Sequence, residues 1–146
     1  IFSTGYMRAE FVAIDPSGTG DVTLSHIKWR SQNAPNMPSM VTHQGILYSI
    51  SDKGIMSCLN VNTGQMINRR RIGGNFSASP LLANGKIYLS SREGVVTVIQ
   101  CDQNLSTLAT NKFDATIMAS PAVVDNDLIL RTGNRIYRLG ETKNIN

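Results

Sequence analysis

One segment of this 146-residue chain occurs three times, at intervals of 40 and then 41 residues. Its central copy reads NFSASPLLANGKIYLSSREG, from Asn75 to Gly94, and altered copies lie at Asn36–Gly54 and Met118–Asn134. An internal repeat constrains the fold strongly, because each copy must adopt the same local structure and pack against the next copy. The sequence therefore predicts a row of similar units.

Within each copy, short apolar runs alternate with tight turns. The runs ILYSI, KIYL, VVTVI and DLIL are nearly continuous, as in strands covered on both faces, and the 3.6-residue spacing of an amphipathic helix is absent. Turns such as His43-Gln44-Gly45 and Asn62-Thr63-Gly64 end on glycine, which adopts positive φ at little cost. Alignment of the copies gives three columns: Ser39, Ser79 and Ser120; Gly45, Gly85 and Asn126; Tyr48, Tyr88 and Ile129.

A period near 40 residues with four short strands is the signature of a β-propeller blade. We therefore predict an all-β, partial β-propeller of four-stranded antiparallel blades, about three and a half in number. Blade one covers residues 1–35 and lacks its first strand, and blade four covers residues 116–140 and lacks its fourth. Blades two and three are complete, at residues 36–74 and 75–115, and residues 141–146 form a polar tail.

Charge and hydropathy narrow the classes of partner. The net charge is +4, but Lys and Arg are spread along the chain apart from the run Arg69–Arg71, so we expect no nucleic-acid partner. That run is most simply a charged edge strand that resists aggregation, and the alternative is an anion site. No stretch of 18 apolar residues occurs, so no membrane span is expected. Cys58 and Cys101 are expected to be buried apolar thiols, the alternative being a disulfide between them.

Two segments carry a more specific signal: Cys58-Leu59-Asn60-Val61-Asn62-Thr63-Gly64, and Ala13-Ile14-Asp15 followed by Trp29. They resemble the repeat of the pyrroloquinoline-quinone (PQQ)-like β-propeller family, whose blades carry an Ala-x-Asp-x-x-Thr-Gly turn and a following tryptophan. In blade two, Cys58, Asn60 and Asn68 occupy the Ala, Asp and Trp columns, and blades three and four have lost the turn motif. With the Ser-Pro pairs at 79–80 and 120–121, the resemblance covers nearly the whole chain.

The resemblance implies a structural role for Trp29, because the family's tryptophan docks neighbouring blades. Quinoprotein dehydrogenases of this superfamily hold PQQ against a tryptophan and adjacent cysteines, with calcium and an aspartate base, and no such set can be matched here. The resemblance therefore favours a non-catalytic ligand-binding, protein-binding or scaffolding domain without cofactor, in a bacterial periplasmic or secreted setting. The alternative is part of a quinoprotein or sugar-acting oxidoreductase, with PQQ and calcium, whose catalytic residues lie outside this chain.

The expected contact surface is one rim of the blades. In propellers, ligands usually sit at the rim that holds the turn between the second and third strands and the link to the next blade. We name Asn75, Phe76, Arg92 and Glu93 as candidate contacts for a protein or a small polar ligand, the alternative being solvated turns. No catalytic or metal-ligating residue is assigned, and both histidines, His26 and His43, are expected at the surface.

A closed ring of seven or eight blades needs about 280 to 340 residues at this period. The expected partners are therefore the remaining blades of a longer chain or a second copy of this one, and the third alternative is that the chain stays an open arc. We favour a piece of a longer chain. The missing first and fourth strands favour the C-terminal portion of a larger ring.

Overall fold

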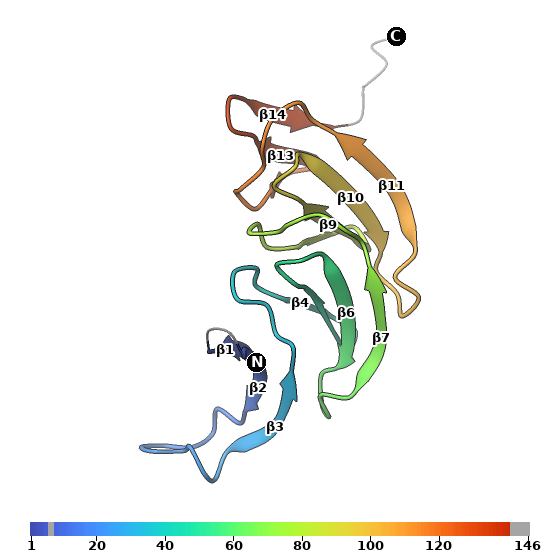
Figure 1. Ribbon diagram of the computed structural model, residues 1–146. Helices are drawn as coiled ribbons and strands as arrows, with labels where there is room; N and C mark the ends of the chain where they lie inside the picture. The colour runs from blue at the N-terminus through green and yellow to red at the C-terminus, as the bar shows by residue number, and fades with distance from the viewer. Residues whose placement is uncertain (6–7, 141–146) are drawn as a thin grey trace.

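The computed structural model describes residues 1–5 and 8–140, so residues 6–7 and the predicted tail at 141–146 lie outside the described part. The described residues form fourteen strands in four antiparallel sheets, without a helix. The sheets follow one another along an arc (Figure 1). The prediction of an all-β, partial propeller is confirmed. No helix in this part of the chain is long and apolar enough to span a membrane.

Each sheet corresponds to one predicted blade, with strands in sequence order from the inside of the arc outwards. Blade one contains β1 (Phe2–Thr4), β2 (Glu10–Ile14) and β3 (Ile27–Gln32). Blade two contains β4 (Val41–His43), β5 (Ile46–Ile50), β6 (Ile55–Asn60) and β7 (Met66–Arg71). Blade three contains β8 (Leu81–Ala83), β9 (Lys86–Ser90), β10 (Val95–Gln100) and β11 (Thr107–Lys112), and blade four contains β12 (Ala122–Val124), β13 (Asp127–Arg131) and β14 (Ile136–Leu139).

A shift in strand register identifies the equivalent strands of the first three blades. The pairs β2–β3, β6–β7 and β10–β11 each contain one irregularity, which follows Ala13, Cys58 and Val98 respectively. In blades two and three this pair joins the third strand to the outermost one. It follows that β2 and β3 are the third and outermost strands of blade one, and that β1 is equivalent to β5.

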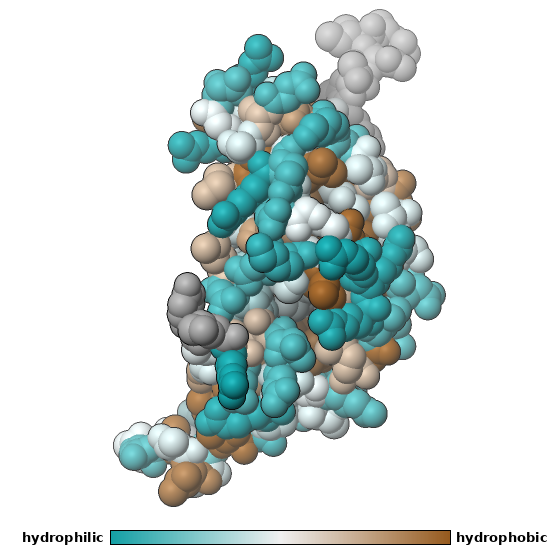
Figure 2. Space-filling model, viewed as in Figure 1, coloured by the Kyte–Doolittle hydropathy of each residue, from teal (hydrophilic) through white to brown (hydrophobic). Residues whose placement is uncertain are grey.

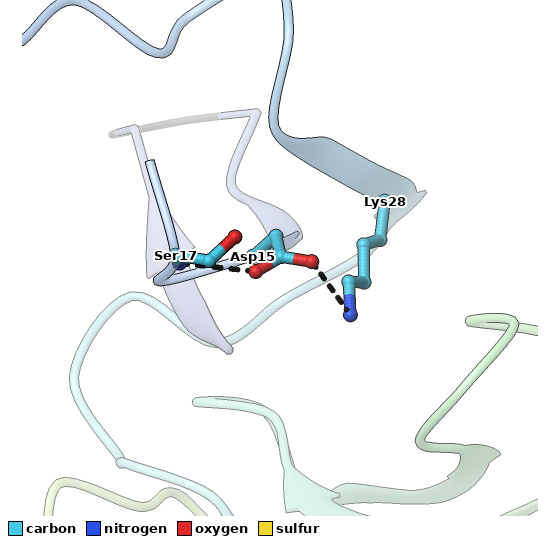
Figure 3. Close-up of polar contacts among 3 residues, drawn as sticks. All are labelled: Asp15, Ser17 and Lys28. Atoms are coloured by element: carbon cyan, nitrogen blue, oxygen red, sulfur yellow. Dashed lines mark hydrogen bonds and ion pairs between the residues drawn. The ribbon is translucent and has the colours of Figure 1, made fainter. Parts of the chain in front are cut away.

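The Asp column of the family motif shapes the turn that leaves the third strand. In blade one, Asp15 Oδ1 accepts the Ser17 backbone N–H at 3.0 Å, and Asp15 Oδ2 lies 3.2 Å from Lys28 Nζ (Figure 3). The Ser17 hydrogen bonds, assisted by Lys28, lower the pKa of Asp15 to about 2. In blade two, Asn60 Oδ1 accepts the N–H groups of Asn62 and Thr63 at 2.9 and 3.1 Å. An amide thus replaces the carboxylate as the acceptor.

Blade three keeps this turn with a different residue. Asp102 Oδ1 accepts the N–H groups of Asn104 and Leu105, both at 2.9 Å. The motif is absent from the sequence of blade three, as the alignment indicated, but the side-chain cap of the turn is present. The acceptor lies two residues after Gln100, which occupies the motif column, and a short polar side chain can cap a turn from either position.

Trp29 lies at the joint between blades one and two. Its side chain is 9% exposed, and its Nε1–H donates to the Val61 carbonyl oxygen at 2.9 Å. Its ring lies against Gly64, where an added Cβ would stand 2.4 Å from Trp29 Cε3. Leu47 and Leu59 of blade two belong to the same apolar cluster as the tryptophan. These contacts support the docking role, which stays a prediction until Trp29 is substituted.

The joint between blades two and three is filled differently. Asn68 stands in the Trp29 column, and its Nδ2 donates to the Gln103 carbonyl at 2.8 Å, while Arg70 Nη1 donates to the Leu105 carbonyl at 2.8 Å. Leu105 is equivalent to Gly64, since each lies four residues before the outer-strand column. Both have positive φ, 56° and 69°, but the Leu105 side chain is fully buried in the core between these blades. The first joint thus pairs the large Trp29 with Gly64, and the second joint pairs the smaller Asn68 with Leu105.

The innermost strands are joined by serines. The Ser39 N–H donates to Ser79 Oγ, and the Ser79 N–H donates to Ser120 Oγ, both at 2.9 Å. These residues form the serine column of the sequence repeat, and the hydroxyl of each blade accepts from the blade before it. Between blades two and three, the Ser39–Ser79 contact at the inner end and the Asn68–Gln103 contact at the outer end together hold both ends of the joint.

Apolar clusters fill the spaces between blades, and polar strands face outwards. The largest cluster lies between blades two and three and includes Tyr48, Ile87 and Ile99. The outer strands β7 and β11 are almost entirely exposed, and most of their residues are polar. The face in Figure 2 is mainly hydrophilic with separate small hydrophobic patches. Cys58 and Cys101 are both free, so the disulfide alternative is wrong. Cys58 is buried as expected, but Cys101 is only half-buried, so that part of the prediction is wrong. Desolvation raises the pKa of both thiols.

Two glycines allow a matched test of the joint between blades one and two. Gly45 and Gly64 have φ of 76° and 69°, but an added Cβ at Gly45 meets nothing within 4 Å. Gly45→Ala should therefore cost only the strain of a side chain at positive φ, about 1 to 2 kcal/mol. Gly64→Ala should cost at least about 1 kcal/mol more, because the methyl group overlaps the Trp29 ring. Chemical denaturation measures both, and equal losses would contradict the docking contact.

Candidate functional site

The rim that holds the β5–β6 and β9–β10 turns contains two similar contacts, which we call clasps. In each clasp, an acidic side chain accepts N–H groups from the link between two blades. Asp52, in the turn between β5 and β6, accepts the Asn36 N–H at 2.9 Å through Oδ2 and the Met37 N–H at 3.2 Å through Oδ1. Asn36 Nδ2 also reaches Asp52 Oδ2 at 3.4 Å. One carboxylate therefore fixes the link from blade one to blade two, and its oxygens are engaged by the chain itself.

Glu93 forms the equivalent clasp on blade three and involves two of the predicted contact residues. Its Oε2 accepts the Asn75 N–H at 3.1 Å and its Oε1 accepts Asn75 Nδ2 at 2.7 Å. The Asn75 side chain, and then its backbone, lower the pKa of Glu93 to about 2. Lys53 Nζ lies 3.4 Å from Asn75 Oδ1, and Lys112 Nζ donates to the Glu93 carbonyl oxygen. The structure thus brings Asn75 and Glu93 together, on one rim, as the sequence placed them.

Phe76 does not take the place expected of it. Its side chain is 2% exposed and lies in the core between blades two and three. Its backbone N–H donates to the Asp52 carbonyl oxygen at 3.0 Å. The expectation that Phe76 offers a surface contact is therefore wrong, because the link turns its aromatic ring inwards. It anchors the link on which Asn75 stands.

Arg92, the fourth candidate, reaches across to another link. Its Nη2 lies 3.0 Å from Met37 Sδ, and its backbone N–H donates to the Asn75 carbonyl at 2.7 Å. Its Nε is buried without a partner among the described residues. Arg92 is half-buried, and Met37 beside it is 59% exposed. The two side chains therefore lie together at the rim.

Exposed methionines at the rim escaped the sequence prediction. Met37, Ser77 and Met118 occupy one column of the repeat, two residues before the serine column. Met118 is 58% exposed, and its Sδ lies 3.8 Å from Ser77 Oγ. The alignment shows this column, but it does not show that its methionines are exposed. An apolar residue such as methionine is usually expected in the core. The three candidates Asn75, Arg92 and Glu93 with Met37 and Met118 form what we call the rim patch.

The described residues do not provide the donor set that PQQ with calcium needs. No group of three or more His, Cys, Asp or Glu side chains gathers among them. The rim carboxylates of Asp52 and Glu93 are already engaged by N–H donors, whereas calcium requires six to eight converging oxygens. The His26 ring Nδ1 lies 2.7 Å from the neighbouring Ser25 hydroxyl. This part of the chain therefore does not fit that cofactor.

Comparisons with known proteins give a structural answer only. No family model matches the sequence. No curated protein matches it either. Among solved structures, BamB from Moraxella catarrhalis has a TM-score of 0.64 at 16% identity, over 86% of this chain and 40% of that one. The quinohemoprotein alcohol dehydrogenase ADHIIG from Pseudomonas putida HK5 has a TM-score of 0.55 at 15% identity, over 66% of this chain and 16% of that one.

A europium-containing methanol dehydrogenase gives a TM-score of 0.52 at 14% identity, over 74% of this chain and 23% of that one. The chain has the fold of a PQQ-like β-propeller. It spans less than half the length of each of these structures. The PQQ-like fold is shared by BamB and by dehydrogenases, so it does not choose between a binding role and a catalytic one.

The Glu93 clasp makes a prediction about pH. A carboxyl whose pKa is lowered on folding stabilises the protein above its unfolded value of about 4.5, and this contribution is lost as the pH falls through about 2. In a carboxyl-carbon NMR titration, Glu93 should have a midpoint near 2. Asn75→Ala should raise that midpoint towards the ordinary glutamate value. Asn62→Ala, an exposed asparagine in the turn between β6 and β7, should leave it unchanged. A midpoint that ignores Asn75→Ala would refute the clasp.

Proposed function

We propose that this chain is part of a non-catalytic PQQ-like propeller that binds a protein partner through the rim patch. The observation that carries the proposal is Met37, which is largely exposed, carries the Arg92 guanidinium on its sulfur and is held by Asp52 through its backbone. Methionine and arginine are enriched at protein interfaces relative to the rest of the surface. A flexible thioether beside a planar cation offers both apolar contact and hydrogen-bond donors.

The rim is organised before a partner arrives. Asp52 and Glu93 pin the two links, and the inner serines fix neighbouring blades beneath them. Binding loses less free energy when the contacting residues are already ordered. A second exposed methionine, Met118, extends the patch onto the next blade. The patch therefore suits a partner that lies across two or three blades and inserts an apolar side chain beside Arg92.

The likeness to BamB supports a protein-binding role and an envelope or secreted location. It is a likeness in fold, so both features are part of the proposal. The neighbouring blades that complete a ring, from the same polypeptide or from a second copy, are further partners. The proposal includes no nucleic-acid partner, since the cations at the rim are interspersed with the carboxylates of Asp52 and Glu93.

The competing function is that of a quinoprotein or sugar-acting oxidoreductase. The likeness to a quinohemoprotein alcohol dehydrogenase and a methanol dehydrogenase favours it. In that case PQQ, calcium and the catalytic residues would be held by blades outside this chain, because the residues described here do not fit them. The rim patch would then be a surface of the enzyme without a role in the reaction.

Introduction of a negative charge into the rim patch tests the binding proposal. In the complete protein, Met37→Glu and Met118→Glu should each lower the affinity for a purified, identified envelope partner at least tenfold, or by about 1.4 kcal/mol. Met66→Glu is the matched control, because Met66 is 38% exposed on β7, on the outer edge, and should bind normally. Calorimetry measures affinity, and thermal unfolding checks the fold.

Two outcomes would overturn the proposal. One is partner binding that survives both rim substitutions. The other is saturable binding of PQQ and calcium with dye-linked oxidation of an alcohol or a sugar, which would establish the oxidoreductase.

A further inference from the structure

One buried column of the repeat holds a polar residue in blade two and leucine in blades three and four. Ser49, Leu89 and Leu130 are equivalent, at the spacing of 40 and then 41 residues. Leu89 and Leu130 are 1% and 0% exposed, and each fills the space towards the preceding blade in an apolar cluster. Ser49 faces blade one, because Leu47, two residues earlier on the same strand face, packs with blade-one residues.

The serine begins a polar row that crosses blade two. Ser49 on β5 stands opposite Ser57 on β6, and Ser57 stands opposite Arg69 on β7. Ser49 is 3% exposed, Ser57 is half-buried and Arg69 is exposed. All three side chains line the same groove. The row therefore runs from a buried hydroxyl to a cation in solvent.

Small residues on blade one leave this side open. Ala9 and Ala34 face the row, and the Ala34 N–H donates to the Ala9 carbonyl at 3.1 Å, which closes the end of that blade. The result is a groove of about 710 Å³ between blades one and two, within the size range of small-molecule sites. Blades three and four have leucine where blade two has Ser49.

The charges around the groove are unbalanced. Its lining includes the cations Arg8, Lys53 and Arg69 and the acids Glu10 and Asp52. Glu10 is paired with Arg30 at 3.2 Å, and the Asp52 oxygens accept N–H groups from the neighbouring link. In the described part of the chain, none of the three cations forms an ion pair. The groove therefore combines an excess of positive charge with serine hydroxyls in its lining.

From this arrangement we propose that the groove binds a small hydroxylated organic anion, with its carboxylate or phosphate at Arg69 and its hydroxyl groups along Ser57 and Ser49. Arginine suits such anions because its planar fork donates two parallel hydrogen bonds. The three arginines of the run thus have different surroundings. Arg70 donates to a carbonyl of blade three, Arg71 is exposed on the edge strand, and Arg69 lines the groove. The site is distinct from the rim patch and does not depend on the protein-binding proposal.

Three polyhydroxylated compounds distinguish a carboxylate ligand, a phosphate ligand and a neutral one. Gluconate carries a carboxylate, glucose 6-phosphate carries a phosphate, and glucose is neutral. In the complete protein at low salt, either anion should shift the backbone amide NMR signals of Ser49, Ser57 and Arg69 in a saturable way, while glucose should not. Gluconate alone would assign a carboxylate ligand, and glucose 6-phosphate alone a phosphate ligand.

Two variants test the site with their own controls. Ser49→Leu restores the residue of the neighbouring blades, so it should keep or raise the midpoint of thermal unfolding while it weakens anion binding at least tenfold. Arg69→Ala should also weaken it at least tenfold, whereas Arg71→Ala, outside the groove on the same strand, should not change it. The proposal fails if glucose binds as well as the anions, if neither anion binds, or if binding is unaffected by Ser49→Leu and Arg69→Ala.

Discussion

The joint between neighbouring blades is the contact on which the rest of this structure depends. A four-stranded sheet cannot bury both of its faces alone, so each blade is stable only against the next one. At the outer end of the first two joints, a side-chain N–H donates to a carbonyl in the turn of the following blade, from Trp29 to Val61 and from Asn68 to Gln103. At the inner end, serine contacts link blade two to blade three and blade three to blade four. Between them, apolar side chains fill the space, and their size must match the joint.

This matching explains why the repeat tolerates so much sequence change. Trp29 requires Gly64, because any side chain there would enter the ring, whereas the smaller Asn68 leaves room for the buried Leu105. The same rule read in reverse gives the groove: where Leu89 and Leu130 fill a joint, Ser49 leaves space. The combined volume of the two facing side chains is thus similar in the first two joints. At Ser49 in the first joint, the side chain is smaller than the leucine of blades three and four, and a groove remains. The rim clasps depend on this frame, since Asp52 and Glu93 hold links whose positions the blades determine.

The sequence predicted the fold well because the signals that define it are local and repeated. Apolar runs, turn glycines and a 40-residue spacing predicted the all-β repeat architecture and the serine column. It failed where packing decides the outcome. Phe76 looked like a rim residue because it stands in a link, and only the core between blades two and three shows where its ring goes. Asp102 was missed because a turn can be capped from more than one position. The groove depends on contacts between units, although the serine that opens it was visible in the alignment.

A double-mutant cycle across the first joint tests the central claim most directly. Trp29→Asn and Gly64→Leu together convert that joint into the combination found between blades two and three. If volume matching governs the joints, each single variant should be clearly destabilised, and the double variant should be more stable than the sum of the two losses by about 1 kcal/mol or more. Losses that simply add would show that the two positions do not share a space, and would contradict this account of how the blades are held together.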